Sequence, residues 1–171
     1  MTGLSNSQTE ATFIDAPRDP DLQALYNYWN GVRGKRPMPS RQDIDPMAIP
    51  KLLPFVFMYN VTAEGGGYTV RIAGEELIRF LGSNPKGHPA GSSMTQRGAM
   101  VLVKVLDAVA MERAPKFRAG KAHWRPEREH RDFEGCFLPL SSDGQTVDII
   151  FGGVKFPRDQ SMASATAPSL A

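Results

Sequence analysis

The chain has 171 residues, 41% of them hydrophobic and 22% charged, and its formal net charge at pH 7 is +2. This length suits one domain with a packed core, and so small a net charge gives no argument for nucleic-acid binding. No apolar run reaches the length of a membrane span, and the first residues lack the basic and apolar regions of a secretion signal. The single cysteine, Cys136, excludes an internal disulfide and fits a reducing compartment, so we expect a cytoplasmic protein.

The N-terminal part predicts a loose arm followed by a helix. Residues 1–18 are polar and aperiodic, whereas Asp19 and Pro20 are a helix-start signal. An apolar stripe then follows over residues 20–31, at the spacing of one helical face. This stripe either packs on a sheet or is buried against a second subunit. It is therefore the candidate dimer or partner surface, formed by Leu22, Leu25, Tyr26 and Trp29.

A basic, proline-interrupted segment follows the first helix. It spans residues 33–41 and carries Arg33, Lys35, Arg36 and Arg41. It is either a solvated connection or a patch for phosphate or acidic partners. Asp45 and Pro46 then predict a short helical turn.

The next stretch predicts a hairpin that leads into a helix. Residues 55–61 are nearly all apolar and predict a strand, and a glycine-rich turn follows it. The second strand begins at Tyr68 and alternates. Its residues Tyr68, Val70 and Ile72 are expected on one face, and Arg71 on the other. A helix is then expected over residues 75–81. Gly74 lies at the change from strand to helix, a sharp turn that a side chain at this position would obstruct.

The C-terminal half predicts one long helix and three strands. The helix spans residues 97–113, and the strands span residues 116–124, 133–140 and 146–156. The tail, 158–171, is expected to fray, which leaves one domain over 19–157. Because strands surround a helical middle, we expect the α+β class, with an antiparallel sheet that carries helices on one face.

Three stretches resemble a known family: LYNYW (25–29), MPSRQDIDPMAIPKLLP (38–54) and YTVRIAGEELIRFLG (68–82). With the element order, they make the chain similar to the stand-alone bacterial PAS domains of the PAS_5 type over residues 20–156. The resemblance implies a five-stranded antiparallel sheet of order 2-1-5-4-3, with a core pocket between the sheet and its helices. It also implies a sensory or interaction module, usually in signalling.

The residues do not favour the cofactors of other PAS domains. The long helix has no histidine for haem, and His88, His123 and His130 lie in or beside loops. Cys136 lies on an expected strand, without the neighbours of the flavin-binding cysteine of light-sensing PAS domains, and is expected to be a small packed side chain. No ligand spacing predicts a metal site.

The candidate ligand pocket is apolar, and a bound ligand is expected to be small and mostly apolar or aromatic. Arg71 is expected to form an ion pair with Asp43, Asp45 or Glu76, or else to recognise a ligand. The candidate pocket residues are Phe57, Tyr59, Val70, Ile72, Leu77, Phe80, Leu102, Leu106, Phe137, Ile149 and Phe151.

The leading hypothesis is a PAS-type sensory module without catalysis, which forms a homodimer and acts through an unidentified signalling protein. One alternative is a cone-shaped α+β enzyme, which needs an inward acid or histidine, and Asp148 alternates away from its apolar neighbours. Another is a basic adaptor that binds nucleic acid or a cyclic dinucleotide through residues 33–41. Under the leading hypothesis, nucleic acid is not an expected partner, and neither is a membrane.

Overall fold

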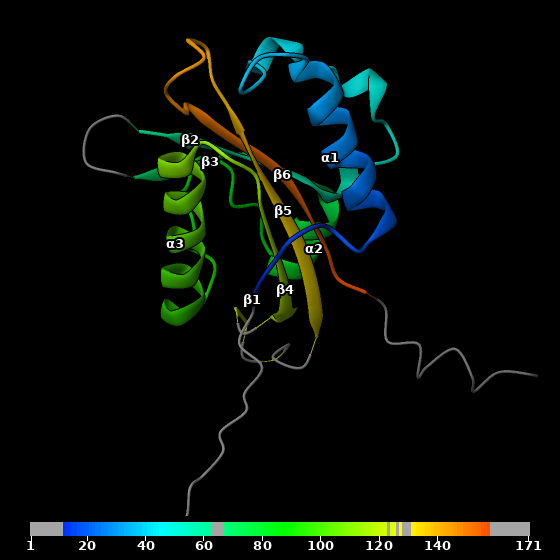
Figure 1. The fold of residues 1–171 in the computed structure, drawn as a ribbon. Coiled ribbons are helices and arrows are strands. Elements are labelled where there is room, and N and C mark those ends of the chain that lie inside the picture. The colour runs from blue at the N-terminus through cyan, green and yellow to red at the C-terminus, as the bar shows by residue number, and fades with distance from the viewer. Residues whose placement is uncertain (1–11, 63–66, 123, 126, 128–130, 158–171) are drawn as a thin grey trace, which may run out of the picture.

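The computed structural model describes residues 12–62, 67–122, 124, 125, 127 and 131–157. These residues form one antiparallel sheet with helices on both of its faces (Figure 1). The elements in chain order are β1 (Thr12–Ile14), α1 (Pro20–Arg33), the 3-10 turns η1 (Arg41–Asp43), η2 (Pro46–Ala48) and η3 (Leu53–Phe55), β2 (Val56–Val61), β3 (Tyr68–Ala73), α2 (Glu75–Leu81), α3 (Gln96–Glu112), β4 (Lys116–Lys121), β5 (Asp132–Leu140) and β6 (Ile149–Lys155).

The predicted α+β class is confirmed, and so is the order of the five expected strands. The sheet order is β1-β4-β5-β6-β2-β3, and β2 to β6 within it follow the order 2-1-5-4-3 when numbered from β2. The sixth strand, β1, was not predicted. It pairs with β4 at the sheet edge and comes from the part of the chain expected to be a loose arm. Three residues are too few for an alternating pattern to be recognised. The ranges 1–11 and 158–171 lie outside the described residues.

α1 covers one face of the sheet, which we call the α1 face. Asp19 caps the helix by accepting the main-chain N–H groups of Asp21 and Leu22. Leu22 and Leu25 pack where β6 has Gly153, and the ring nitrogen of Trp29 donates to the main-chain oxygen of Pro139 at 3.0 Å. The apolar stripe is therefore buried on the sheet of its own chain, so Leu22, Leu25 and Trp29 are not available as a partner surface.

α2 and α3 cover the opposite face, which we call the pocket face (Figure 1). The buried stripe of α3 contains Leu102, Val105, Leu106 and Val109. Gly74 lies at the change from β3 to α2, where a Cβ atom would lie 2.4 Å from the main-chain oxygen of Pro54. The expectation that a side chain would obstruct this turn is confirmed.

A β-bulge in β3 changes which residues share a face. Tyr59 pairs with Val70, whereas the adjacent Met58 pairs with Ile72, so Arg71 is the extra residue. Because Met58 and Tyr59 point to opposite faces, Val70 and Ile72 do so too. The prediction that they share a face is therefore wrong, and the bulge is the reason.

Candidate functional site

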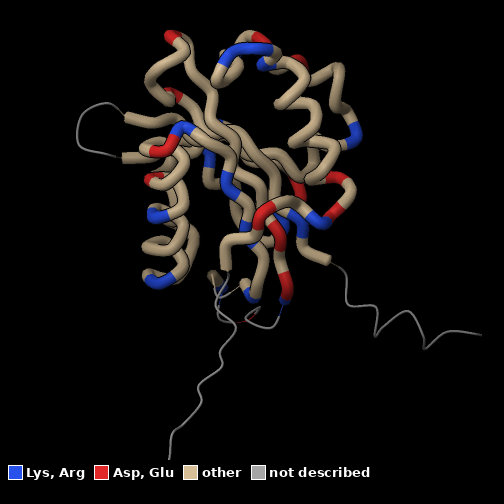
Figure 2. The backbone as a smooth tube through the Cα atoms, in the orientation of Figure 1, with Lys and Arg blue, Asp and Glu red and all other residues tan. Residues whose placement is uncertain are grey.

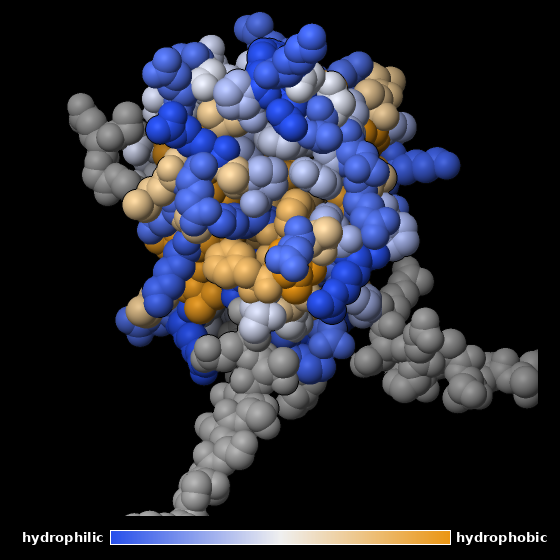
Figure 3. Space-filling view, in the orientation of Figure 1, coloured by the Kyte–Doolittle hydropathy of each residue, from blue (hydrophilic) through white to orange (hydrophobic). Residues whose placement is uncertain are grey.

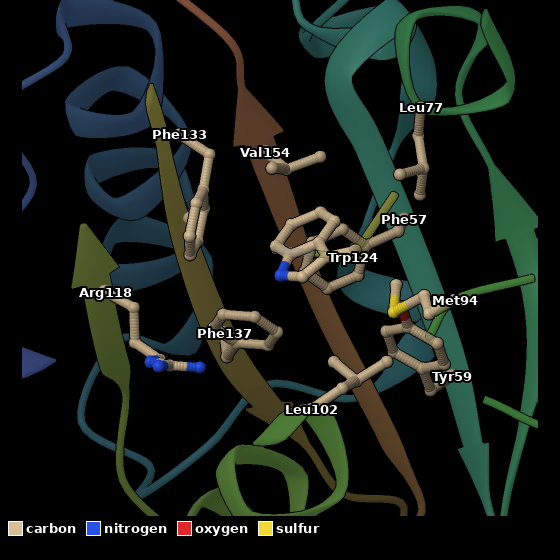
Figure 4. Close-up of a pocket in the computed structure, with 11 residues that line it drawn as sticks. Phe57, Tyr59, Leu77, Met94, Leu102, Arg118, Trp124, Phe133, Phe137 and Val154 are labelled. Carbon is tan, nitrogen blue, oxygen red and sulfur yellow. The ribbon is translucent and has the colours of Figure 1, made fainter. Parts of the chain in front are cut away.

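An apolar pocket lies between the pocket face of the sheet and the two helices that cover it (Figure 4). Its volume is about 20 Å³, room for roughly one water molecule. The side chains thus nearly fill the space in this conformation. The wall is formed by Phe57, Tyr59, Leu77, Met94, Leu102, Arg118, Trp124, Phe133, Gly135, Phe137 and Val154.

Five of the eleven described wall residues are aromatic. The ring of Phe57 lies 5.2 Å from that of Tyr59 and 5.2 Å from that of Phe137, between centroids. The ring of Trp124 lies 4.6 Å from that of Phe133, between centroids, and is drawn among the other lining side chains in Figure 4. Tilted rings at these distances are the preferred packing of aromatic side chains, so the wall suits another flat, apolar molecule.

Among the described residues of this wall, Arg118 is the one with a charged side chain. It lies on β4 opposite Gly135 of β5, only 7% exposed, with its guanidinium 5.6 Å from the ring of Phe13 on β1. Burial lowers the pKa of Arg118, but an arginine begins so far above neutral pH that it stays charged. The pocket therefore has one buried cation in an otherwise apolar surface. The sequence analysis missed it, because the alternation with Phe117 shows only that the two side chains face opposite sides of the sheet.

Five of the predicted pocket residues line this pocket: Phe57, Tyr59, Leu77, Leu102 and Phe137. Val70 lines a smaller hollow next to it, together with Tyr59 and Leu77. Phe80 lies behind the wall, stacked on Phe156 at 3.9 Å and edge-on to Trp124. Leu106 is buried on α3 outside the pocket wall.

The other three predicted pocket residues lie on the α1 face. Ile72 is moved there by the bulge, and Phe151 pairs with Met58 and Leu138 of that face. Ile149 belongs to the same alternation as Phe151, so Ile150, Gly152 and Val154 are the β6 residues that face the pocket side. Both faces of β6 are covered and apolar, so the hydrophobicity of its residues does not predict which face carries the pocket.

Cys136 and the histidines lie away from the pocket. Cys136 is fully buried on β5 with its side chain on the α1 face, and burial raises the pKa of its thiol to about 12. It is a small packed side chain, as expected. His88 is exposed, while His123 and His130 lie outside the described residues. Among the described residues, no group of histidine, cysteine and acidic side chains has the arrangement of a metal site, and no described helix is long and apolar enough to cross a membrane.

The basic segment after α1 is mostly tied into local structure. Arg33 donates to Asn30 and to the main-chain oxygen of Arg36, and Arg36 forms an ion pair with Asp43 at 2.9 Å. Figure 2 shows Lys and Arg gathered along this segment. The predicted ion pair of Arg71 is wrong. Asp43 pairs with Arg36 and Glu76 with Arg79, Asp45 caps η2, and Arg71 donates to Asn60 at 3.3 Å instead.

The fold has the strand order expected of a PAS domain, and sequence comparison agrees. The family model described as PAS_5, a PAS domain, matches residues 18–155, so the chain belongs to the PAS_5 family of PAS domains. No curated protein matches the chain.

Solved structures with a related arrangement include the crystal structure of a Rhodobacter sphaeroides LOV protein. It is 13% identical, with a TM-score of 0.44, over 70% of this chain and 72% of that chain. Another is the structure of an RNA-binding Light-Oxygen-Voltage receptor, which is 11% identical, with a TM-score of 0.47, over 86% of this chain and 38% of that chain.

Proposed function

We propose that this PAS domain is a sensor that binds a small aromatic or apolar molecule in the pocket and passes the signal to a protein partner. The observation that carries the proposal is an enclosed pocket whose described wall contains five aromatic rings and one buried cation, Arg118. An apolar pocket with few polar groups is the usual form of a small-molecule site. Arg118 is the group that would orient an acidic substituent on such a ligand.

The pocket must widen to admit such a ligand, because its present volume suits about one water. Met94 and Trp124 belong to connecting segments rather than to helices or strands. Connecting segments move more readily than the elements that they join. Displacement of these two side chains is therefore the change that would report ligand binding to a partner.

Catalysis is not part of the proposal. A catalytic pocket needs an acid, a base or a nucleophile that faces the substrate. The described wall offers no carboxylate, histidine or cysteine, and Asp148 instead lies beside β6 and accepts the main-chain N–H of Ser142. We therefore assign the chain a binding role.

Native mass spectrometry of the chain purified from its own host tests the proposal. We expect an added mass that is lost in a Leu102→Phe variant, whose larger ring narrows the pocket. Leu138→Met, on the α1 face, is the matched control and should retain the mass. A wild-type chain without added mass, and without stabilisation by a panel of aromatic acids, would show that the pocket is only a filled core.

The same proposal includes a homodimer, because PAS domains commonly associate. The stripe on α1 is already covered, so the exposed apolar side chains lie elsewhere. In the described part of the chain, the large ones are Phe13, Met47, Leu53, Met100 and Met111. Figure 3 shows apolar surface in the middle of the face that carries β1, beside α3. Sedimentation at concentrations on the order of tens of micromolar should show a dimer, and a monomer there would remove this part of the proposal.

A further inference from the structure

A second cleft, separate from the apolar pocket, lies between η1, the β2–β3 pair and the start of β6. Its volume is about 450 Å³, within the usual range for small-molecule sites. Its wall is mostly polar and includes Arg41, Gln42, Asn60, Arg71, Ser142 and Asp148. It therefore differs from the apolar pocket in both size and chemistry.

Two arginines from distant parts of the chain meet in this cleft. Arg41 begins η1, and Arg71 is the extra residue of the bulge in β3. Bulges redirect side chains, and this one brings Arg71 to the cleft. Among the described residues, neither arginine forms an ion pair. The two positive charges therefore have no ion-pair partner in the part of the chain that the structure describes, although Asp148 lies in the same wall.

Both guanidinium groups also keep unused donors. Arg41 donates from Nη1 to the main-chain oxygen of Ile44 at 3.1 Å, while its Nε is buried and has no acceptor. Arg71 uses one nitrogen, Nη1, on Asn60 at 3.3 Å. Since a guanidinium has five N–H donors, most of the donors in this pair have no protein acceptor among the described residues.

The other polar groups of the cleft leave it positively charged overall. Asp148 is the one acid among the described residues of its wall, and its Oδ2 accepts the main-chain N–H of Ser142 at 2.9 Å. Asn60 uses its Oδ1 on Arg71, which leaves its amide nitrogen as a donor, and Gln42 is exposed. The wall thus combines two cations and two amides with a single carboxylate.

We propose that this cleft binds a small phosphate-bearing molecule, with Arg41 and Arg71 donating to the phosphate oxygens. Arginine is the residue best suited to bidentate hydrogen bonds with phosphate. A tetrahedral phosphate offers more acceptors than a carboxylate, and the unused donors here exceed what one carboxylate accepts. Because the cleft is far larger than a phosphate ion, the ligand carries an organic part that the amides of Gln42 and Asn60 bind.

Isothermal titration of the full chain tests the proposal, with inorganic phosphate, a nucleoside monophosphate, succinate and a single-stranded oligonucleotide as probes. We expect binding of the nucleoside monophosphate, weaker binding of phosphate and little binding of succinate. Arg71→Gln and Arg41→Gln should each weaken binding about tenfold or more, because each removes charge-assisted hydrogen bonds. Lys35→Gln, which removes an exposed charge outside the cleft, is the matched control and should bind as the wild type does.

Arg71→Gln is the decisive variant, because Arg71 is exposed and Arg41 contributes to the structure of η1. Unchanged binding in folded Arg71→Gln protein would overturn the assignment, and so would equal loss in Lys35→Gln. Equal affinity for succinate would overturn the phosphate class, and binding of the oligonucleotide alone would overturn the small-molecule class. Loss in Arg71→Gln with retention in Lys35→Gln would support the site.

Discussion

The ring nitrogen of Trp29 donates a buried hydrogen bond to the main-chain oxygen of Pro139, 3.0 Å away, and so ties α1 to β5. The bond fixes α1 on the sheet face opposite the pocket. The sequence placed Trp29 on an apolar stripe but left open whether that stripe faces a sheet or a partner. The hydrogen bond shows that the stripe packs on the sheet of its own chain.

Trp29→Phe should therefore lower the free energy of unfolding by roughly 1–3 kcal/mol, because the oxygen of Pro139 remains buried without its donor. Urea denaturation measures the loss. Tyr26→Phe on the same helix keeps its ring contact with Phe117 and should change the free energy by less than about 0.5 kcal/mol. Equal effects in the two variants would contradict the role of the hydrogen bond.

Two glycines provide a matched test of the close packing of the sheet. A Cβ atom at Gly152 would lie 2.0 Å from the main-chain oxygen of Cys136 and 2.7 Å from the ring of Phe57, whereas one at Gly31 has nothing within 4 Å. Gly152→Ala should destabilise the fold by about 1–3 kcal/mol, since the sheet must shift. Gly31→Ala should stabilise it by about 0.4–1 kcal/mol, because alanine favours a helix. The midpoint temperature of thermal unfolding should fall in Gly152→Ala and rise in Gly31→Ala. A change in the same direction in both variants would be inconsistent with this packing.

Glu134 of β5 binds the main chain of the two residues that precede α1. Its Oε1 accepts the main-chain N–H groups of Arg18 at 2.5 Å and Asp19 at 3.0 Å. Glu134→Ala should cost about 1–3 kcal/mol in unfolding free energy, because two donors lose a charged acceptor. Asp132→Ala on the same strand removes only an exposed ion pair with Lys121 and should cost less than about 1 kcal/mol. A smaller loss in Glu134→Ala than in Asp132→Ala would count against this anchor.

The loop before β6 should respond to acid through Asp143. Hydrogen bonds from the main-chain N–H groups of Thr146 and Gln145 and from the hydroxyl of Ser141 lower the pKa of this carboxyl from 3.8 to about 2. A carboxyl whose pKa is lower in the folded state stabilises that state above pH 3.8, and the contribution is lost as the pH falls toward 2. NMR titration should give a midpoint near the lowered value. Asp143→Asn should remove this part of the acid dependence, and a midpoint near 4 would disprove the hydrogen-bonded loop.

The class of fold was predictable because its signals are local. The capped stripe of α1, the glycine at the start of α2 and the alternating strands each specify one element, and their order specifies the sheet. The wall of the pocket was only partly predictable. Phe57 and Tyr59 both line the pocket, because residues two apart on a strand share a face.

The misplaced residues depend on features that a single sequence does not display. The bulge at Arg71 shifts the register by one residue, which moves Ile72 to the other face. On β6, Ile149 and Phe151 are as apolar as the residues that alternate with them, so hydrophobicity does not distinguish the faces. Arg118 was missed because a charged residue on a strand is normally expected to face solvent.

The most direct test of the proposed sensor is methyl NMR of the chain during titration with benzoate, phenylacetate and indole. The account predicts chemical-shift changes at Leu77, Met94, Leu102 and Val154, with the two acids binding more tightly than indole and losing that advantage in Arg118→Met. Leu25 and Leu138 on the α1 face should not shift. Absence of shifts at millimolar probe, or shifts that are strongest at Leu25 and Leu138, would contradict a ligand pocket between the sheet and α2 and α3.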